Sequence, residues 1–279
     1  MLKLTNIRKL LGLFISILFF SSSVYAEERR LLIDAHIHYS HDAWDMLPPK
    51  VAIKVLRDAG LKNAFVSSSS DKGTQLLYNE APDLIVPVLR PYRKRGELST
   101  WFLDESVIEM IEGRLSKYTF AGIGEFHIFG EDANVPVMKR VVALAKEYGI
   151  FLHAHSDAEA VENIFRQNPE AMVLWAHSGF EGPGKISEML AKYPNLRADL
   201  AFRNEHADSG KVDEAWRKLF LAFPNRIMIG TDTYTPERWY YVIDHANWTR
   251  NWLRDLPSEV ADKIAYKNAQ KLADWALKK

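Results

Sequence analysis

The feature that most constrains the fold is a regular alternation of β-rich runs and helical stretches along residues 31–279. Eight short runs rich in β-branched and aromatic residues predict strands over 31–38, 63–68, 84–89, 120–128, 150–155, 171–178, 196–202 and 226–231. Apolar residues at helical spacing predict helices between them, over 50–59, 106–118, 135–148, 158–167, 185–192, 212–223 and 257–277. A weaker helical pattern covers 71–79. Asp157 and Ser258 stand where helix N-caps are expected.

This alternation predicts the fold class. Eight strands and intervening helices over about 250 residues match the count and length of a (β/α)8 barrel. An open doubly wound sheet is the competing architecture, but no Gly-x-Gly-x-x-Gly segment follows an early strand. No linker or low-complexity stretch divides the chain. We therefore expect residues 27–279 to form a single α/β domain, a (β/α)8 TIM barrel.

The first 26 residues have the composition of a secretory signal peptide. Lys3, Arg8 and Lys9 precede an apolar stretch over 10–20, and small residues lead to Ala26. The apolar stretch is shorter than the ~20 residues of an ordinary membrane span. We expect cleavage after Ala26, a periplasmic or secreted protein, and no stable membrane anchor after cleavage. An uncleaved anchor is the alternative.

Charge and cysteine content narrow the classes of partner. The chain has 36 basic and 36 acidic residues, and loss of the leader would leave a net charge of −3. A slightly acidic surface argues against a general nucleic-acid binder, although a local basic patch remains compatible with it. The absence of cysteine excludes a disulfide framework and a lipoprotein anchor.

The first expected strand ends in the motif Asp34-Ala35-His36-Ile37-His38. Side chains alternate faces along a strand, so the two imidazoles point the same way and together could chelate a divalent ion. Taken alone, two histidines near a surface turn explain the motif equally well. Further polar residues follow the fourth, fifth, sixth and eighth strands: Glu125 and His127, His153 and His155, His177, and Asp232. Since the carboxyl ends of barrel strands meet at one mouth, six of the nine histidines would gather there, which predicts a metal site.

This pattern resembles that of the amidohydrolase superfamily, over residues 31–279. That family has a His-x-His after strand one, an acidic or modified Lys ligand on strand four, one His each after strands five and six, and an Asp after strand eight. The matching residues are His36, His38, Glu125, His153, His177 and Asp232. Residues 264–272 are similar to the family's closing Asn-Ala-x-x-Leu helix. Residues 122–125 are similar to TatD-type hydrolases, whereas 175–179 and 193–196 resemble the amidohydrolase-related group that includes lactonases and decarboxylases.

The resemblance implies metal-dependent chemistry. The donor set suits Zn²⁺ first, with Mn²⁺, Co²⁺, Ni²⁺ and Fe²⁺ as alternatives. If Glu125 bridges, two ions are expected, one beside the His-x-His pair and Asp232, the other beside His153 and His177. If Glu125 only orients a ligand, a single ion is expected. In both cases Asp232 would accept the proton of a metal-activated water and pass it to the leaving group.

Four neighbouring residues are candidates for substrate binding. His155 lies two residues beyond His153 and faces the same side, so it is also an alternative metal ligand. His127 has the same relation to the acidic residue of strand four. Arg90 and Arg203 end the third and seventh strands, where a guanidinium fork would suit a carboxylate or phosphate. A solvated loop is the competing explanation for Arg90.

We therefore expect an exported metal-dependent hydrolase that acts on a small carbonyl substrate, such as a lactone, amide or ester. A TatD-like phosphodiesterase or nuclease and a metal-dependent decarboxylase are alternatives on the same scaffold. A periplasmic protein that binds metal or a ligand without turnover is the non-enzymatic alternative. Fold and metal do not fix the substrate, and the sequence leaves the oligomeric state open.

Overall fold

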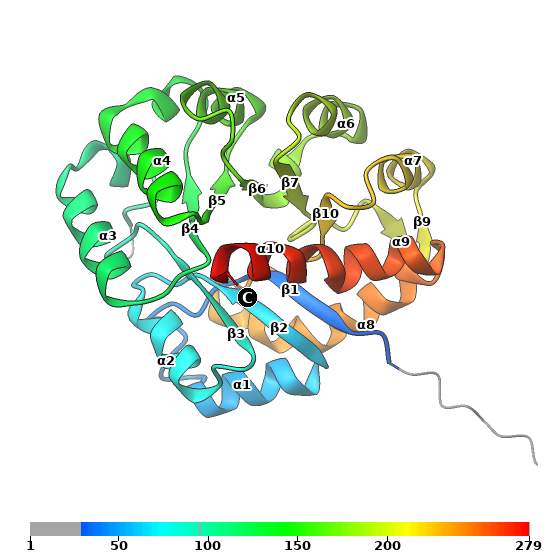
Figure 1. The fold of residues 1–279 in the computed structure, drawn as a ribbon. Helices are drawn as coiled ribbons and strands as arrows, with labels where there is room; N and C mark the ends of the chain where they lie inside the picture. The colour runs from blue at the N-terminus through cyan, green and yellow to red at the C-terminus, as the bar shows by residue number, and fades with distance from the viewer. Residues whose placement is uncertain (1–28, 95, 279) are drawn as a thin grey trace, which may run out of the picture.

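The computed structural model describes residues 29–94 and 96–278, which form a TIM-barrel-like fold (Figure 1). The signal peptide expected over residues 1–26 lies outside this range. The eight parallel strands are β1 (Leu32–Ile37), β2 (Leu61–Val66), β3 (Ile85–Leu89), β4 (Gly122–His127), β5 (Phe151–His155), β6 (Val173–Trp175), β7 (Leu196–Asp199) and β10 (Ile227–Met228). Each pairs with its neighbour in chain order, which confirms the expected eight-stranded parallel sheet.

The sheet is nearly closed into a barrel. Two backbone hydrogen bonds link β1 to the chain that follows β10. The Ala35 N–H donates to Ile229 O at 3.0 Å, and the Asp232 N–H donates to His36 O at 2.8 Å. This seam brings the first metal-binding motif beside Asp232, although almost 200 residues of sequence separate them.

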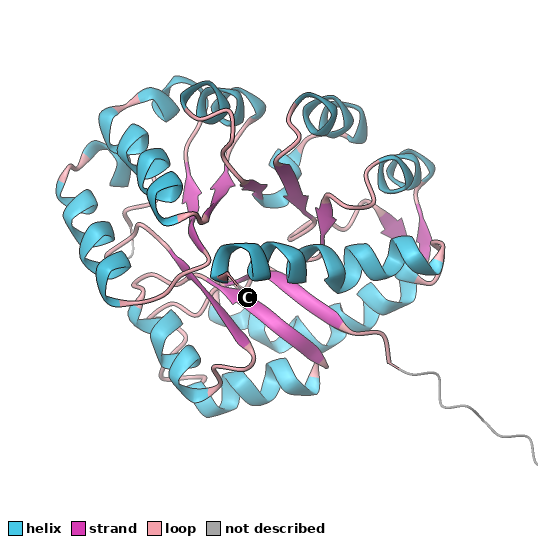
Figure 2. Ribbon diagram, viewed as in Figure 1, coloured by secondary structure: helices cyan, strands magenta, loops and turns pink. Residues whose placement is uncertain are grey.

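Helices surround the barrel (Figure 2). They are α1 (Pro49–Asp58), α2 (Lys72–Glu80), α3 (Ser106–Lys117), α4 (Pro136–Tyr148), α5 (Ala158–Gln167), α6 (Pro183–Lys192), α7 (Glu214–Ala222), α8 (Val242–Leu253), α9 (Ser258–Asp262) and α10 (Asn268–Leu277), with a π-helical turn over Lys263–Lys267. All the expected helices are present. The Asp157 side chain caps α5 by accepting from Ala160 N, but Ser258 makes no cap and Pro257 precedes α9 instead. No bounds were predicted for helix α8, and the small β8–β9 hairpin (Ala207–Asp208 and Lys211–Val212) was not predicted.

Two layers of apolar side chains hold the strands. The outer layer fills the space between strands and helices. The inner layer fills the amino-terminal half of the barrel, where Leu272 and neighbouring residues of α10 pack against Phe65, Phe151 and Leu174. Helix α10 crosses the barrel in Figure 1 and covers this end. The polar residues lie at the opposite end of the barrel, where the strands finish.

Irregular strand register turns the polar residues inward. Between Asp34 and Ile37 the pairing of β1 with β2 shifts. Ile33 and Ala35 belong to the inner layer, whereas Ile37 belongs to the outer layer. The change of face lets His36 and His38 enter the barrel, as bulges elsewhere re-aim side chains. A similar shift between Gly124 and Phe126 accompanies the inward turn of Glu125 on β4.

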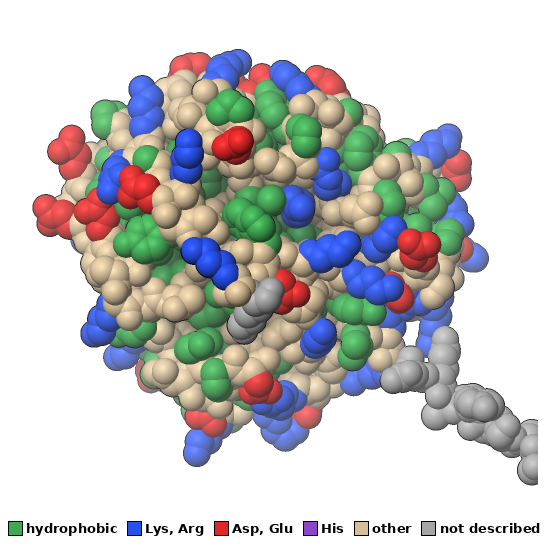
Figure 3. Space-filling model, in the orientation of Figure 1, with side chains coloured by type: hydrophobic (Ala, Val, Ile, Leu, Met, Phe, Trp, Pro, Cys, Tyr) green, Lys and Arg blue, Asp and Glu red, His purple; other side chains and the backbone are tan. Residues whose placement is uncertain are grey.

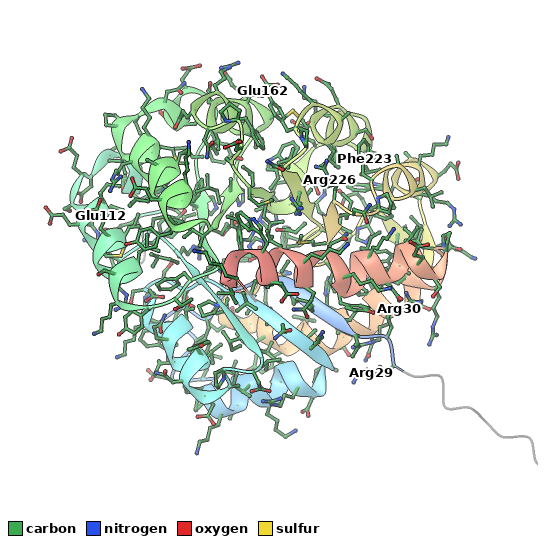
Figure 4. All side chains as sticks on the ribbon, in the orientation of Figure 1. Arg29, Arg30, Glu112, Glu162, Phe223 and Arg226 are labelled. Carbon is green, nitrogen blue, oxygen red and sulfur yellow. The ribbon has the colours of Figure 1, made fainter. Side chains whose placement is uncertain are left out.

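The face seen in Figure 3 mixes acidic, basic and apolar side chains without a single-sign field. Arg30, labelled in Figure 4 at the start of β1, forms a 2.8 Å ion pair with Asp262 of α9. Arg226, labelled in the same view, precedes β10 and donates to the carbonyl of Leu196 at 2.7 Å. Among the described residues, no helix has the length and apolar character that crossing a bilayer requires.

Candidate metal centre

The two histidines of the first motif converge on one point. Their Nε2 atoms are 3.1 Å apart, and both rings are buried. Asp232 Oδ1 lies 3.4 Å from His38 Nε2 and 3.9 Å from His36 Nε2. Glu125 Oε2 lies 3.2 Å from His38 Nε2. The structure thus brings His36, His38, Asp232 and Glu125 together from three different strand ends.

In each ring Nδ1 lies beside a hydrogen-bond acceptor, which leaves Nε2 to face the point where His36 and His38 converge. His38 Nδ1 lies 2.7 Å from the Ser67 carbonyl, and His177 Nδ1 lies 2.8 Å from the Ala201 carbonyl. His36 Nδ1 lies 3.2 Å from Asp199 Oδ2. Carbonyl and carboxylate oxygens only accept hydrogen bonds, so each Nδ1 carries a proton. In the neutral rings, Nε2 is therefore a bare lone pair directed at the centre.

This donor set fits a divalent cation. The Nε2 atoms and the oxygens of Glu125 and Asp232 face one another, and Asp232 Oδ1 is buried with no hydrogen-bond partner among the described residues. Burial opposes a charge on His36, but the carboxylates of Asp199 and Glu125 outweigh it and hold the pKa of His36 well above its usual value. The centre therefore attracts positive charge, which a metal ion would supply.

A second group of donors lies on the other side of Glu125. Glu125 Oε1 is 2.8 Å from His155 Nδ1 and 3.3 Å from His177 Nε2. Its two oxygens thus lie beside two sets of imidazoles, as those of a bridging ligand would. Burial opposes ionisation of Glu125, but His36 and Arg90 hold its pKa well below the usual range.

His153 takes a different position from the one its motif suggested. Its Nε2 lies 3.0 Å from Asp199 Oδ2, and its ring contacts the edge of His36 with centroids 4.6 Å apart. Burial lowers the pKa of His153 to about 4, so this ring is neutral and donates to the carboxylate. The residue that joins Glu125 and His177 in this structure is His155.

Asp199 is a site residue that the sequence interpretation missed. Its Oδ2 accepts hydrogen bonds from His36 Nδ1 and His153 Nε2. Its Oδ1 accepts from the backbone N–H groups of His177, at 2.9 Å, and Ala201, at 3.0 Å. The side chain is fully buried at the end of β7. A signal was present, because a lone carboxylate interrupts the apolar run Ala198-Asp199-Leu200-Ala201 at a strand end.

Both candidate arginines contact the protein itself. Arg90 donates to Glu125 Oε2 at 2.7 Å and to the Glu125 carbonyl at 3.1 Å. Arg203 donates to the carbonyls of His177, at 2.7 Å, and Glu181, at 2.8 Å. The anion-clamping role considered for them stays a prediction, and their described contacts give both a positioning role.

His127 lines the cavity beside the metal centre and is tightly held. Its backbone N–H donates to the Tyr92 hydroxyl at 2.7 Å, and its carbonyl accepts from Trp101 Nε1 at 2.9 Å. The same hydroxyl lies 2.8 Å from His127 Nδ1, to which it can donate its own proton. With the hydroxyl as donor, Nε2 of the neutral ring carries the proton. Burial lowers the pKa of His127 to about 3. His127 is a neutral hydrogen-bond donor.

The metal centre opens into a cavity of about 410 Å³. Glu125, His155, His177 and Asp232 line it together with His127. A cavity of this size accommodates a small molecule. The opening lies at the carboxyl ends of the strands, where barrel active sites occur.

The sequence matches a known protein family. The profile of the amidohydrolase family matches residues 33–274. An uncharacterised TIM-barrel protein from Bordetella bronchiseptica superposes with a TM-score of 0.60 at 14% identity, over 88% of this chain and 99% of that one. The probable 2-pyrone-4,6-dicarboxylic acid hydrolase of Acinetobacter baumannii, solved with citric acid bound, gives 0.52 at 10% identity, over 87% and 98%.

A β-aspartyl dipeptidase from Fervidobacterium islandicum gives a TM-score of 0.53 at 15% identity, over 86% of this chain and 72% of that one. At such identities these likenesses show the fold alone. No curated protein sequence matches the chain.

Proposed function

The chain belongs to the amidohydrolase family, and from this premise we propose that it hydrolyses a small carbonyl substrate, such as a lactone, amide or ester. One observation carries the proposal. Three imidazole Nε2 atoms, each with its Nδ1 bound to an acceptor, face the carboxylates of Glu125 and Asp232 beside an open cavity. This arrangement would hold a divalent cation where a substrate can reach it.

His36, His38, Asp232 and Glu125 would hold the first cation, and imidazole with carboxylate donors suits Zn²⁺ best. Glu125, His155 and His177 offer a second place. We assign His155 rather than His153 to that place, because Asp199 occupies His153 Nε2. When bound, the cation supplies a water of lowered pKa and polarises the scissile carbonyl.

Asp232 is the proton acceptor in this proposal. Its Oδ1 has no hydrogen-bond partner among the described residues, and the side chain lines the cavity. The carboxylate would take the proton of the attacking water and return it to the leaving group. His127, fixed as an Nε2–H donor by Tyr92, would donate a hydrogen bond to the substrate from the same cavity.

The test combines metal removal with Asp232→Asn. Protein treated with chelator and then reloaded with Zn²⁺ is assayed on a panel of neutral lactones, esters and amides. We expect turnover only after reloading, and a loss in kcat of about 100-fold or more in Asp232→Asn. Asp208→Asn, on the exposed β8–β9 hairpin, is the matched control and should keep full activity. Turnover that survives both treatments would refute the proposal, and release of carbon dioxide would indicate decarboxylation instead.

The role of His127 has its own test in Tyr92→Phe. The variant removes the hydroxyl that fixes the proton on His127 Nε2 and leaves the His127 N–H without its acceptor. We expect a lower kcat with metal content unchanged, and a shift of the His127 proton toward Nδ1 in imidazole ¹⁵N NMR spectra. An unchanged tautomer and unchanged kcat would exclude the role.

Export is the second part of the proposal, and it rests on the leader-like residues 1–26. Expression of the full chain in a Gram-negative host, followed by N-terminal sequencing of the periplasmic fraction, tests it. We expect the mature protein to begin at Glu27. Recovery of the intact chain from the cytoplasm would contradict export and would not affect the hydrolase proposal.

A further inference from the structure

Three large aromatic side chains form one wall of the cavity. Phe180 follows β6, Phe202 follows β7 and Tyr234 follows β10, so three separate loops contribute them. They are 51%, 44% and 51% exposed, respectively. Phe202 stands edge-on to both neighbours, with centroids 6.4 Å from Phe180 and 5.8 Å from Tyr234. We call these three residues the aromatic wall.

The backbone holds two of these rings in a conformation that bulky residues rarely adopt. Phe180 has φ of 56° and Phe202 has φ of 58°, both in the left-handed region. Non-glycine residues in this region cluster at binding and active sites, where the surrounding structure enforces them. Their positions thus favour a role in binding over one in packing.

Arg238 and His177 pack against the rings of the aromatic wall. The Arg238 guanidinium carbon lies 4.7 Å from the Phe202 ring centre and 5.5 Å from that of Tyr234. Arg238 is itself fixed by donating to the backbone carbonyls of Thr231 and Asp232. The Phe180 ring stacks on His177, with centroids 4.7 Å apart and planes 17° from parallel. The wall is therefore coupled to the metal centre.

The charges of the cavity disfavour an anionic substrate group. Apart from histidines, Arg90 is the basic residue among the described lining residues, and its guanidinium is ion-paired with Glu125 at 2.7 Å. Glu125 and Asp232 belong to the metal centre, and Asp42 is the acidic lining residue outside it. A carboxylate on the substrate, away from the metal centre, would find no lysine or second arginine among the described lining residues to pair with.

We propose that the aromatic wall selects an uncharged substrate that carries an aromatic or similarly flat apolar ring next to the scissile carbonyl. This inference rests on the proposed function for its scissile bond. It adds the recognition element. A flat ring in the cavity would make offset or edge-to-face contacts with Phe180, Phe202 and Tyr234, as aromatic pairs prefer.

The test measures binding, so that it does not depend on turnover. Calorimetric titration of the Zn²⁺-loaded protein compares benzohydroxamate, acetohydroxamate and 4-carboxybenzohydroxamate, which share one chelating group and differ in ring and charge. We expect benzohydroxamate to bind at least about tenfold more tightly than acetohydroxamate, and the carboxylated ring to lose that advantage. Equal affinity for the first two compounds, binding of neither, or tightest binding of the carboxylated compound would overturn the inference.

Variants assign the preference to the wall. Phe202→Ala and Tyr234→Ala should each bring benzohydroxamate affinity close to that of acetohydroxamate and leave acetohydroxamate affinity unchanged. Trp275→Ala removes an aromatic ring of 45% exposure on α10, at the other end of the barrel, and should change neither affinity. A ring preference that survives both wall variants refutes the assignment. A ring preference without turnover on any carbonyl substrate would refute the proposed function and leave the binding inference standing.

Discussion

At the scale of the residue, the metal centre depends on hydrogen-bond acceptors that determine which nitrogen of each imidazole carries the proton. Asp199 is the most connected of them, because it receives two histidine rings and two backbone N–H groups. Such residues behind a metal ligand orient the ring and raise its basicity, and their loss typically weakens metal affinity about 10–100-fold.

We therefore predict that Asp199→Asn lowers Zn²⁺ affinity by about 10–100-fold, as measured by competition with a chromogenic chelator. The amide would present N–H groups to His36 Nδ1 or His153 Nε2, both of which need an acceptor. Asp208→Asn should leave the affinity unchanged, since that residue is exposed. A normal Zn²⁺ affinity in Asp199→Asn would show that Asp199 does not control the ligand ring.

At the scale of the element, close approach of strands requires glycine at the seam of the barrel. A Cβ built on Gly230 would lie 2.8 Å from His36 Cβ and 2.9 Å from Ala201 Cβ. Neither neighbour is the end of a flexible side chain, so both the seam and the ligand His36 would have to move.

Gly230→Ala should accordingly lower the free energy of unfolding by about 1–3 kcal/mol and also weaken Zn²⁺ binding. Gly184→Ala is the matched control, because its added Cβ meets open space in the first turn of α6. That control should be neutral or stabilising by up to about 1 kcal/mol. Urea denaturation measures both, and equal stability of the two variants would contradict the seam argument.

The sequence predicted the elements well, because apolar periodicity and boundary residues are local signals. All eight strands and the helices from α1 to α7 follow from them. No bounds were predicted for helix α8, because the polar residues Thr249 and Arg250 interrupt the apolar pattern of its buried face. The selection of His155 beside Glu125, and of Asp199 behind His36 and His153, depends on register shifts and ring orientation. These arise from tertiary packing, which spacing along the chain does not encode.

At the scale of the whole molecule, one buried histidine is expected to limit acid stability. His206 packs among the rings of Trp216, Trp248 and Trp252, and both ring nitrogens are buried without a hydrogen-bond partner among the described residues. Burial lowers its pKa to about 3, from an ordinary value of 6.5. Below pH 6.5 the unfolded chain binds a proton at His206 that the native protein excludes, so stability falls as the solution is acidified.

This linkage predicts a loss from His206 of about 3 kcal/mol between pH 7 and pH 4. His206→Leu removes the titrating group, so its stability should fall less over the same range. Urea denaturation at pH 7, 5.5 and 4 on both proteins measures the difference. Parallel pH profiles for the wild type and the variant would show that the native protein accommodates protonated His206.

A bound ion would also act on the molecule as a whole, because its ligands come from β1, β4 and the chain after β10. The first and last of these meet at the barrel seam. A ligand that binds only the native state at 100 times its Kd stabilises it by about 2.7 kcal/mol. For a chain of this size that corresponds to a rise in Tm of roughly 5–10 °C. We predict such a rise when Zn²⁺ is added back to chelator-treated protein, measured by calorimetry. In Asp232→Asn the rise should shrink, because one of the converging oxygens is replaced by an amide. A Tm that Zn²⁺ leaves unchanged in the wild type would contradict the metal centre itself.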